Sequence, residues 1–137
     1  MTIYKFFGQG TGGAEDAVAS VDIQFDGVIE GMSLQTRSTS TMSGGDHVEA
    51  ELSFLSTSNI GKHDARGSLL QADFGLHQTS SGATDKVGRS QMTGIAIPVH
   101  AGERVYMHVN GSTGETQDVT GYLYVADNAP VAPIRRR

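Results

Sequence analysis

The chain has 137 residues, of which 37% are hydrophobic, and a formal net charge of −5. This length predicts a single domain with a two-layer core, and the absence of cysteine excludes a disulfide framework and thiolate chemistry. Three of the ten basic residues are Arg135, Arg136 and Arg137; the rest of the chain is therefore more acidic than the total, and a broad nucleic-acid surface is not expected.

Apolar runs are short throughout the sequence. The N-terminal run stops after Phe7, whereas a secretory signal needs an apolar core of roughly 7–15 residues. No run approaches the roughly 18 apolar residues of a membrane helix. We therefore expect a protein made in the cytoplasm, with no membrane partner.

Alternation of apolar and polar residues is the main structural signal. A period of two is typical of strands with one buried and one solvated face. Such runs predict strands at 2–7, 21–25, 28–36, 48–54, 70–76, 91–99, 104–110 and 119–126. Asp26-Gly27 predicts a tight hairpin turn, and a second turn is expected at 100–103. Residues 14–20 have a mild preference for helix. We nevertheless expect no helix longer than about two turns, although ordinary domains contain a substantial helical fraction.

Taken together, these elements predict an all-β protein, an antiparallel β-sandwich or jelly roll of about eight strands with flexible terminal arms. Residues 1–13 are expected to form an N-terminal arm with a Gly-rich hinge, 14–128 the β-sandwich domain, and 129–137 an extended Pro/Arg C-terminal arm. Pro130 and Pro133 prevent a helix in the last segment. A disordered terminus is the alternative for it.

Apolar side chains are concentrated at the two ends of the chain, where a free monomer would expose them. We expect these residues and the terminal arginines to contact a neighbouring subunit: Ile3, Tyr4, Phe6, Phe7, Val131, Ile134, Arg135, Arg136 and Arg137. Burying each large side chain would contribute roughly 1.5–3 kcal/mol, whereas surface ion pairs contribute about 0–1 kcal/mol each. The apolar residues should therefore anchor the contact.

Candidate cofactor and metal sites are weak. Gly8, Gly10 and Gly13 fit G-x-G-x-x-G, but the helix and βαβ units that a dinucleotide fold needs do not follow, which favours a linker. The five histidines are His47, His63, His77, His100 and His108. His100 and His108 flank a predicted hairpin and could face each other, but the paired spacing of a zinc site is missing. We predict no cofactor and no metal.

Catalytic signals are equally sparse. G-x-S-x-G does not occur. Glu49 and Glu51 are expected on the solvated face of one strand, without the lined cleft that a glycosidase acid needs. The sequence therefore predicts a protein that is not an enzyme. A carbohydrate-binding module is the main alternative, because Tyr106, Tyr122 and Tyr124 could stack on sugars; otherwise these tyrosines close the core edge or an interface.

Two blocks carry a resemblance to a known family. Residues 25–34, FDGVIEGMSL, look like the strand–Asp-Gly–strand opening of small jelly-roll structural proteins of bacteriophage virions. Residues 99–109, VHAGERVYMHV, resemble a hairpin found late in such domains. The resemblance implies a capsid decoration or cement protein, or a fibre or tail component, located in the virion. Such a protein is usually a homotrimer, binds major capsid or other virion proteins, and has no catalytic residues.

Overall fold

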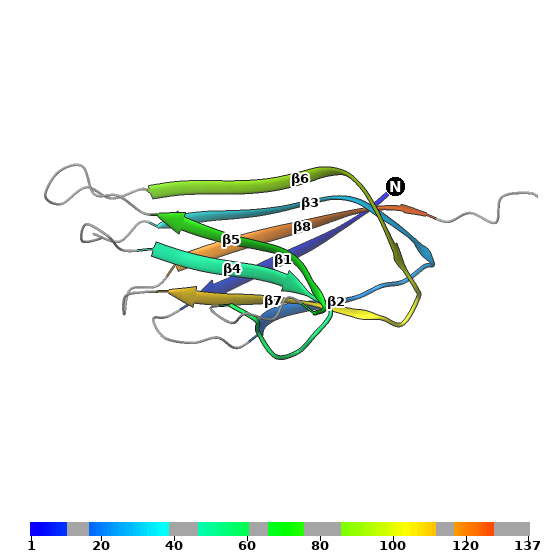
Figure 1. Ribbon diagram of the computed structural model, residues 1–137, viewed down its shortest axis with the longest axis horizontal. Coiled ribbons are helices and arrows are strands. Elements are labelled where there is room, and N and C mark those ends of the chain that lie inside the picture. The colour runs from blue at the N-terminus through cyan, green and yellow to red at the C-terminus, as the bar shows by residue number, and fades with distance from the viewer. Residues whose placement is uncertain (11–16, 39–46, 61–65, 76–85, 112–116, 128–137) are drawn as a thin grey trace, which may run out of the picture.

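A computed structural model of the chain describes residues 1–10, 17–38, 47–60, 66–75, 86–111 and 117–127. It contains eight antiparallel strands in two four-stranded sheets (Figure 1). The strands are β1 (Thr2–Gly10), β2 (Ala17–Asp22), β3 (Gly27–Ser38), β4 (His47–Ser53), β5 (Ser68–Gly75), β6 (Lys86–Val99), β7 (Arg104–Gly111) and β8 (Gln117–Asp127). No described residue belongs to a helix that could cross a membrane.

The strand order is β1-β8-β3-β6 in the first sheet and β2-β7-β4-β5 in the second. Apart from β4 and β5, consecutive described strands lie in different sheets, so the chain repeatedly crosses the sandwich. Two four-stranded antiparallel sheets wound in this way form a jelly roll. The predicted fold class is confirmed.

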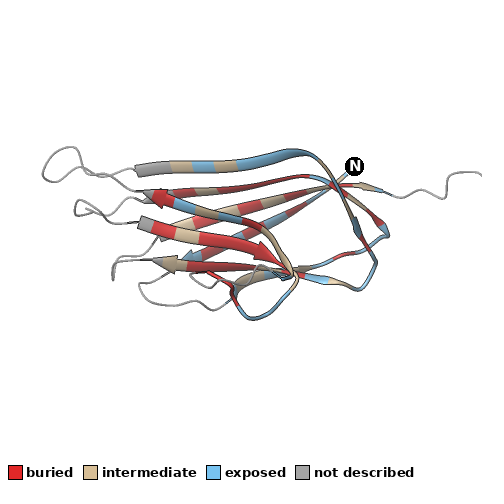
Figure 2. Cartoon of the chain, viewed as in Figure 1, coloured by how far each residue is buried: buried red, intermediate tan, exposed pale blue. Residues whose placement is uncertain are grey.

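The core lies between the inner faces of the two sheets. Alternation along β4 sends Val48, Ala50 and Leu52 inward, and all three are fully buried. Met107 of β7 and Leu123 of β8 meet them there. Figure 2 shows β4 buried along much of its length, whereas much of β6 is exposed. On the outer face of β4, Glu51 is also fully buried.

The N-terminal strand differs from the expected arm. Residues Thr2–Gly10 form β1 and pair along their whole length with β8, from Thr2 opposite Val125 to Gly10 opposite Gln117. Tyr4 and Phe6 lie in the core, at 8% and 1% exposed. The arm prediction for residues 1–13 is therefore wrong over the first ten residues. The prediction failed because β1 pairs with β8, which lies more than a hundred residues later in the chain. Local sequence carries no signal for such a distant partner.

The two predicted hairpins are also corrected. Residues 23–26 connect β2 to β3 and residues 100–103 connect β6 to β7, and each connection crosses from one sheet to the other. The connections hydrogen-bond to each other: the Ile23 amide donates to the Glu103 carbonyl (2.8 Å) and the Gly102 amide to the Ile23 carbonyl (2.9 Å). The Ala101 amide donates to Asp26 Oδ1 at 2.9 Å. Both turn signals thus mark sheet crossings.

The first crossing also shifts a predicted element. β2 runs from Ala17 to Asp22, over part of the mildly helical segment, and ends before Phe25. Phe25 is 55% exposed, whereas Ile23 is buried at 1%. The strand ends early because Ile23 already bonds to the 100–103 connection.

Candidate functional site

An apolar strip runs along the outer face of β1 and β8. Ile3 and Phe7 point outward from β1 and are 56% and 58% exposed. Tyr124 lies opposite Ile3 in the register, and Tyr122 lies two residues earlier on the same face. The rings of Tyr122 and Tyr124 stack, with centroids 6.3 Å apart and planes at 23°. We call Ile3, Phe7, Tyr122 and Tyr124 the aromatic strip.

A polar pair follows Phe7 on the same face of the aromatic strip, where Gln9 Nε2 donates to Asp118 Oδ1 at 2.7 Å. At the other end of the two strands, on the inner side, Thr2 Oγ1 donates to Asp127 Oδ1 at 2.9 Å. Lys5 is exposed and lies opposite Tyr122. The strip is therefore an apolar area with a polar rim and one cation within it, which is the usual composition of an interaction surface.

The outer face of the second sheet carries a buried polar cluster. Glu51 of β4 and His108 of β7 lie opposite each other in the register, and both are fully buried. Alternation places both outward, as the sequence predicts for Glu51. Solvent is excluded because the chain after β4, residues 54–60, folds back over this face, with Ser58, Asn59 and Ile60 buried there. We call residues 54–60 the covering segment.

Hydrogen bonds hold Glu51 beneath the covering segment. The Asn59 amide donates to Glu51 Oε1 at 3.0 Å, and Ser58 Oγ donates to the same oxygen at 3.4 Å. Gln71 Nε2, from β5, donates to Oε2 at 2.9 Å. A buried carboxylate is stable only when its oxygens are satisfied in this way. Glu51 therefore ties the covering segment to β5, and the expectation of a solvated Glu51 is wrong.

His108 makes the second tie. Its Nε2 lies 2.8 Å from the Leu55 carbonyl oxygen, and since a carbonyl only accepts, Nε2 carries the proton and donates it. Nδ1 is buried and has no hydrogen-bond partner among the described residues. The Tyr106 ring stacks beside the imidazole, with centroids 6.2 Å apart. Tyr106 thus lies on the opposite sheet from Tyr122 and Tyr124, and the three cannot form one sugar platform.

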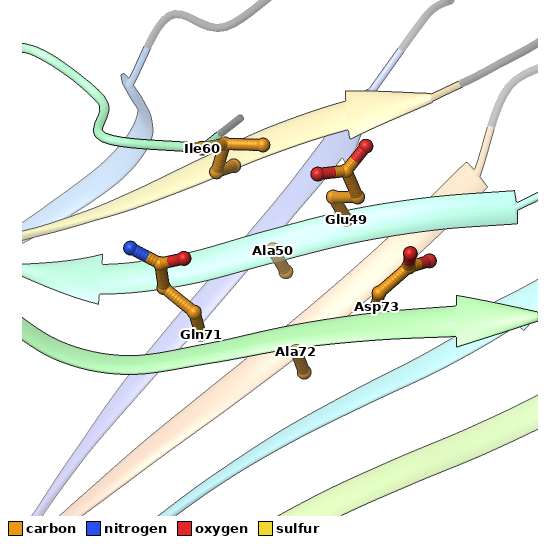
Figure 3. Close-up of a pocket in the computed structure, with 6 residues that line it drawn as sticks. All are labelled: Glu49, Ala50, Ile60, Gln71, Ala72 and Asp73. Carbon is orange, nitrogen blue, oxygen red and sulfur yellow. The ribbon is translucent and has the colours of Figure 1, made fainter. Parts of the chain in front are cut away.

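A shallow pocket of about 250 Å³ lies beside the covering segment. It is lined by Glu49, Ala50, Ile60, Gln71, Ala72 and Asp73. Glu49 and Asp73 are directly opposite across β4 and β5, and Figure 3 shows their carboxylates on the same side of the sheet. Two carboxylates therefore line the same side of the pocket.

The histidines do not converge. His100 lies at the β6–β7 crossing with its side chain 72% exposed, its Nδ1 3.7 Å from Asp26 Oδ1, whereas His108 is buried under the covering segment. The expectation that they face each other is wrong, because β6 and β7 belong to different sheets. The side chains of His47, His63 and His77 lie outside the described residues. Within the described part of the chain, no three potential ligands come together as a metal site.

The predicted interface residues separate into three groups. Ile3 and Phe7 are exposed in the aromatic strip, whereas Tyr4 and Phe6 belong to the core and cannot contact a partner. The Tyr4 hydroxyl instead accepts a hydrogen bond from the Gln24 amide at 2.9 Å. The C-terminal members lie outside the described residues: Val131, Ile134, Arg135, Arg136 and Arg137.

The residues of the family-like block at 99–109 have structural contacts. Glu103 Oε1 accepts from the His100 amide at 2.6 Å and closes the crossing. Arg104 donates from Nε to Asp22 Oδ1 at 2.7 Å across β2 and β7. This hydrogen bond and the charge of Arg104 hold the pKa of the Asp22 carboxyl below its ordinary value of 3.8. The block therefore stabilises a sheet crossing.

Comparisons with known proteins give fold likenesses only. No protein-family model matches the chain, and no curated protein matches its sequence. Eiger TNF from S. frugiperda is similar with a TM-score of 0.45 at 14% identity, covering 98% of both chains. A structure of Sacbrood virus of honeybee, in expansion state II, is similar with a TM-score of 0.42 at 10% identity, covering 98% of this chain and 88% of that one. The Israel acute paralysis virus pentamer gives 0.42 at 11% identity, covering 90% and 88%.

Proposed function

We propose that the chain is a non-enzymatic structural protein of a virus particle, a capsid decoration or cement protein or another virion component. The observation that carries the proposal is the aromatic strip on the outer face of a jelly-roll sheet. Double-sheet jelly rolls build viral capsid domains, and because a fold alone does not fix a function, the surface matters. Assembly would bury Ile3 and Phe7, which a monomer leaves more than half exposed.

The proposed protein associates with itself and with neighbouring capsid subunits. The sequence resemblance implies a trimer, of a bacteriophage particle, assembled after synthesis in the host cytoplasm. A non-enzymatic role is supported by the buried polar cluster: Glu51 and His108 lie opposite each other across β4 and β7, and the covering segment separates both from any substrate.

The test is the fate of the protein in infected cells or producer strains. We expect it to sediment with purified particles and to be released when Phe7→Ala and Ile3→Ala are combined, since both side chains are exposed and their loss should not unfold the sandwich. A protein that stays wholly outside the particle fraction contradicts the proposal.

A carbohydrate-binding module is the second candidate, because lectin domains also use jelly rolls. The observation that favours it is the stacked, half-buried pair of Tyr122 and Tyr124, since tyrosine rings offer apolar area with a polar handle. Glycan binding that is lost on Tyr122→Ala or Tyr124→Ala, with assembly intact, would select this function over the virion role.

A further inference from the structure

A two-sheet sandwich has four edge strands, here β1 and β6 in one sheet and β2 and β5 in the other. An edge strand carries backbone N–H and C=O groups without partners in its own sheet, and these can pair with another chain. Natural sheets protect such edges with short strands, charges, prolines or bulges. An edge strand that lacks these protections is available to pair with another chain.

Three edges are protected. β6 contains Pro98 and the exposed Arg89, and its register with β3 shifts near Gly94, which has a φ of 70°. β2 has six residues and an irregular register between Ala17 and Ala19. β5 carries the exposed carboxylate of Asp73 and begins at a register shift against β4.

β1 has none of these protections apart from one charge. It is nine residues long, contains no proline and pairs with β8 without a register shift. Lys5 is its single charged residue, between the exposed Ile3 and Phe7. Its described backbone hydrogen bonds all belong to the ladder with β8. A long, regular, apolar edge of this kind is a template for adding a strand.

We propose that β1 pairs antiparallel with β1 of a second copy of this chain, which joins two β1-β8-β3-β6 sheets into one continuous sheet. The inference rests on the proposed self-association and names its contact. A two-fold axis perpendicular to the sheet keeps both outer faces on the same side. Each outward residue of one β1 then lies opposite an outward residue of the other.

Charge and length select the register. Pairing centred on Lys5 sets two ammonium groups directly opposite each other, which is destabilising. Pairing centred on Phe6 uses the whole strand and gives roughly eight to ten backbone hydrogen bonds, because every second pair exchanges two. It also places Lys5 of each copy opposite Phe7 of the other, where the ammonium is attracted to the ring. Pairing centred on Phe7 leaves the first residues of the strand unpaired.

The contact is isologous, so it joins copies in pairs. Two single chains give a dimer, and two trimers related by D3 symmetry, with all three β1 edges paired, give a particle of six chains. Breaking the contact therefore halves the mass of the assembly and leaves any three-fold contact intact. This mass change separates the β1 contact from self-association through another surface.

The test is a positive charge added across the two-fold axis, followed by light scattering on the full-length protein at tens of micromolar. Phe7→Lys places the new ammonium opposite Lys5 of the other copy, twice in each pair. We expect the mass to halve and the dissociation constant to rise by roughly tenfold or more, because like charges replace two favourable contacts. Adding Lys5→Glu to Phe7→Lys makes these pairs opposite in charge and should restore the wild-type mass.

Ile3→Lys is the matched control. It adds the same charge to the same face of the same strand, at a side chain of similar exposure, but lies opposite the uncharged Gln9 in this register. We expect the mass to stay at the wild-type value. A circular dichroism spectrum of each variant establishes that the sandwich is folded.

Each other outcome overturns the β1 contact and says what remains. If the wild type assembles and Phe7→Lys has the same mass, self-association stands but uses another surface. A wild type that is monomeric removes both the contact and the proposed self-association. Loss of particle binding in Phe7→Lys that Lys5→Glu does not rescue, with a monomeric wild type, means that Phe7 contacts another virion protein and not a second copy of this chain.

Discussion

The Glu51 carboxylate is fully buried under the covering segment and accepts hydrogen bonds from Asn59, Ser58 and Gln71. Replacing it by alanine removes the acceptor of the buried Asn59 amide. We expect Glu51→Ala to lower the free energy of unfolding by about 1–3 kcal/mol, which is the usual cost of one unsatisfied buried group. Urea unfolding followed by circular dichroism measures it.

Asp73 provides the control for Glu51. It is a carboxylate on the same outer face, one strand away, but it is exposed. Asp73→Ala should change the free energy of unfolding by no more than about 0.5 kcal/mol, as is usual for surface positions. Equal effects of the two substitutions would mean that burial of Glu51 does not stabilise the covering segment.

The ion pair of Asp22 and Arg104 should give a pH-dependent contribution to stability. Arg104 lowers the pKa of the Asp22 carboxyl in the folded state, so the contribution is present above the ordinary value of 3.8 and is lost as the pH falls through the lowered pKa. We expect Asp22→Asn to unfold at a slightly lower temperature than the wild type at pH 7. The gap should close in acid and shrink in high salt. A gap that widens in acid would contradict this assignment.

At the scale of elements, alternation was sufficient to find most strands. Val48–Phe54 and Leu70–Leu76 match β4 and β5 closely because each has one core face along its length. Partner choice was not predictable, since pairs such as β1 with β8 depend on the whole chain path. The same limit hid the burial of Glu51: alternation correctly turns it outward, but nothing in residues 54–60 indicates which face they will cover.

Gly27 is a glycine for a reason other than the hairpin turn that the sequence predicted. Its position after Asp26 suggested a hairpin turn, but it begins β3 after the sheet crossing. A Cβ atom there would lie 2.6 Å from the Ala126 carbonyl oxygen and 2.7 Å from Val125 Cγ1. The glycine is therefore required by the close approach of β8.

Substitutions at two glycines of β3 test this reason. Gly27→Ala should lower the free energy of unfolding by about 1–3 kcal/mol, because overpacking against backbone forces a shift of β8. Gly31→Ala is the matched control, since the nearest atom to its Cβ, Tyr124 Cδ2, is at 3.4 Å; it should be close to neutral. Thermal unfolding of both variants provides the measurement, and equal destabilisation would assign the effect to glycine itself.

At the scale of the molecule, the jelly-roll path makes the N-terminal strand part of the body. β1 is hydrogen-bonded to β8, the last described strand, and supplies Tyr4 and Phe6 to the core. The two outer faces then differ: the covering segment closes one over Glu51 and His108, while the other exposes the aromatic strip. The exposed apolar side chains Ile3 and Phe7 therefore lie on the first strand, which pairs with the last described strand, β8.

Truncation at each end of the chain should show which terminal residues belong to the folded sandwich and which form an arm. Deleting residues 2–7 removes Tyr4 and Phe6, and losing one large core aromatic costs about 3–5 kcal/mol. The loss of both, together with most of the β1–β8 ladder, is comparable to the whole stability of about 5–15 kcal/mol of a native domain, so we expect the chain to be largely unfolded. Deleting 128–137 removes no residue of the described core and should leave the midpoint of urea unfolding unchanged, while particle binding weakens through the loss of Val131, Ile134 and the three arginines. If the protein lacking residues 2–7 is folded, β1 is dispensable to the sandwich, and the interpretation of these residues as an N-terminal arm would be correct.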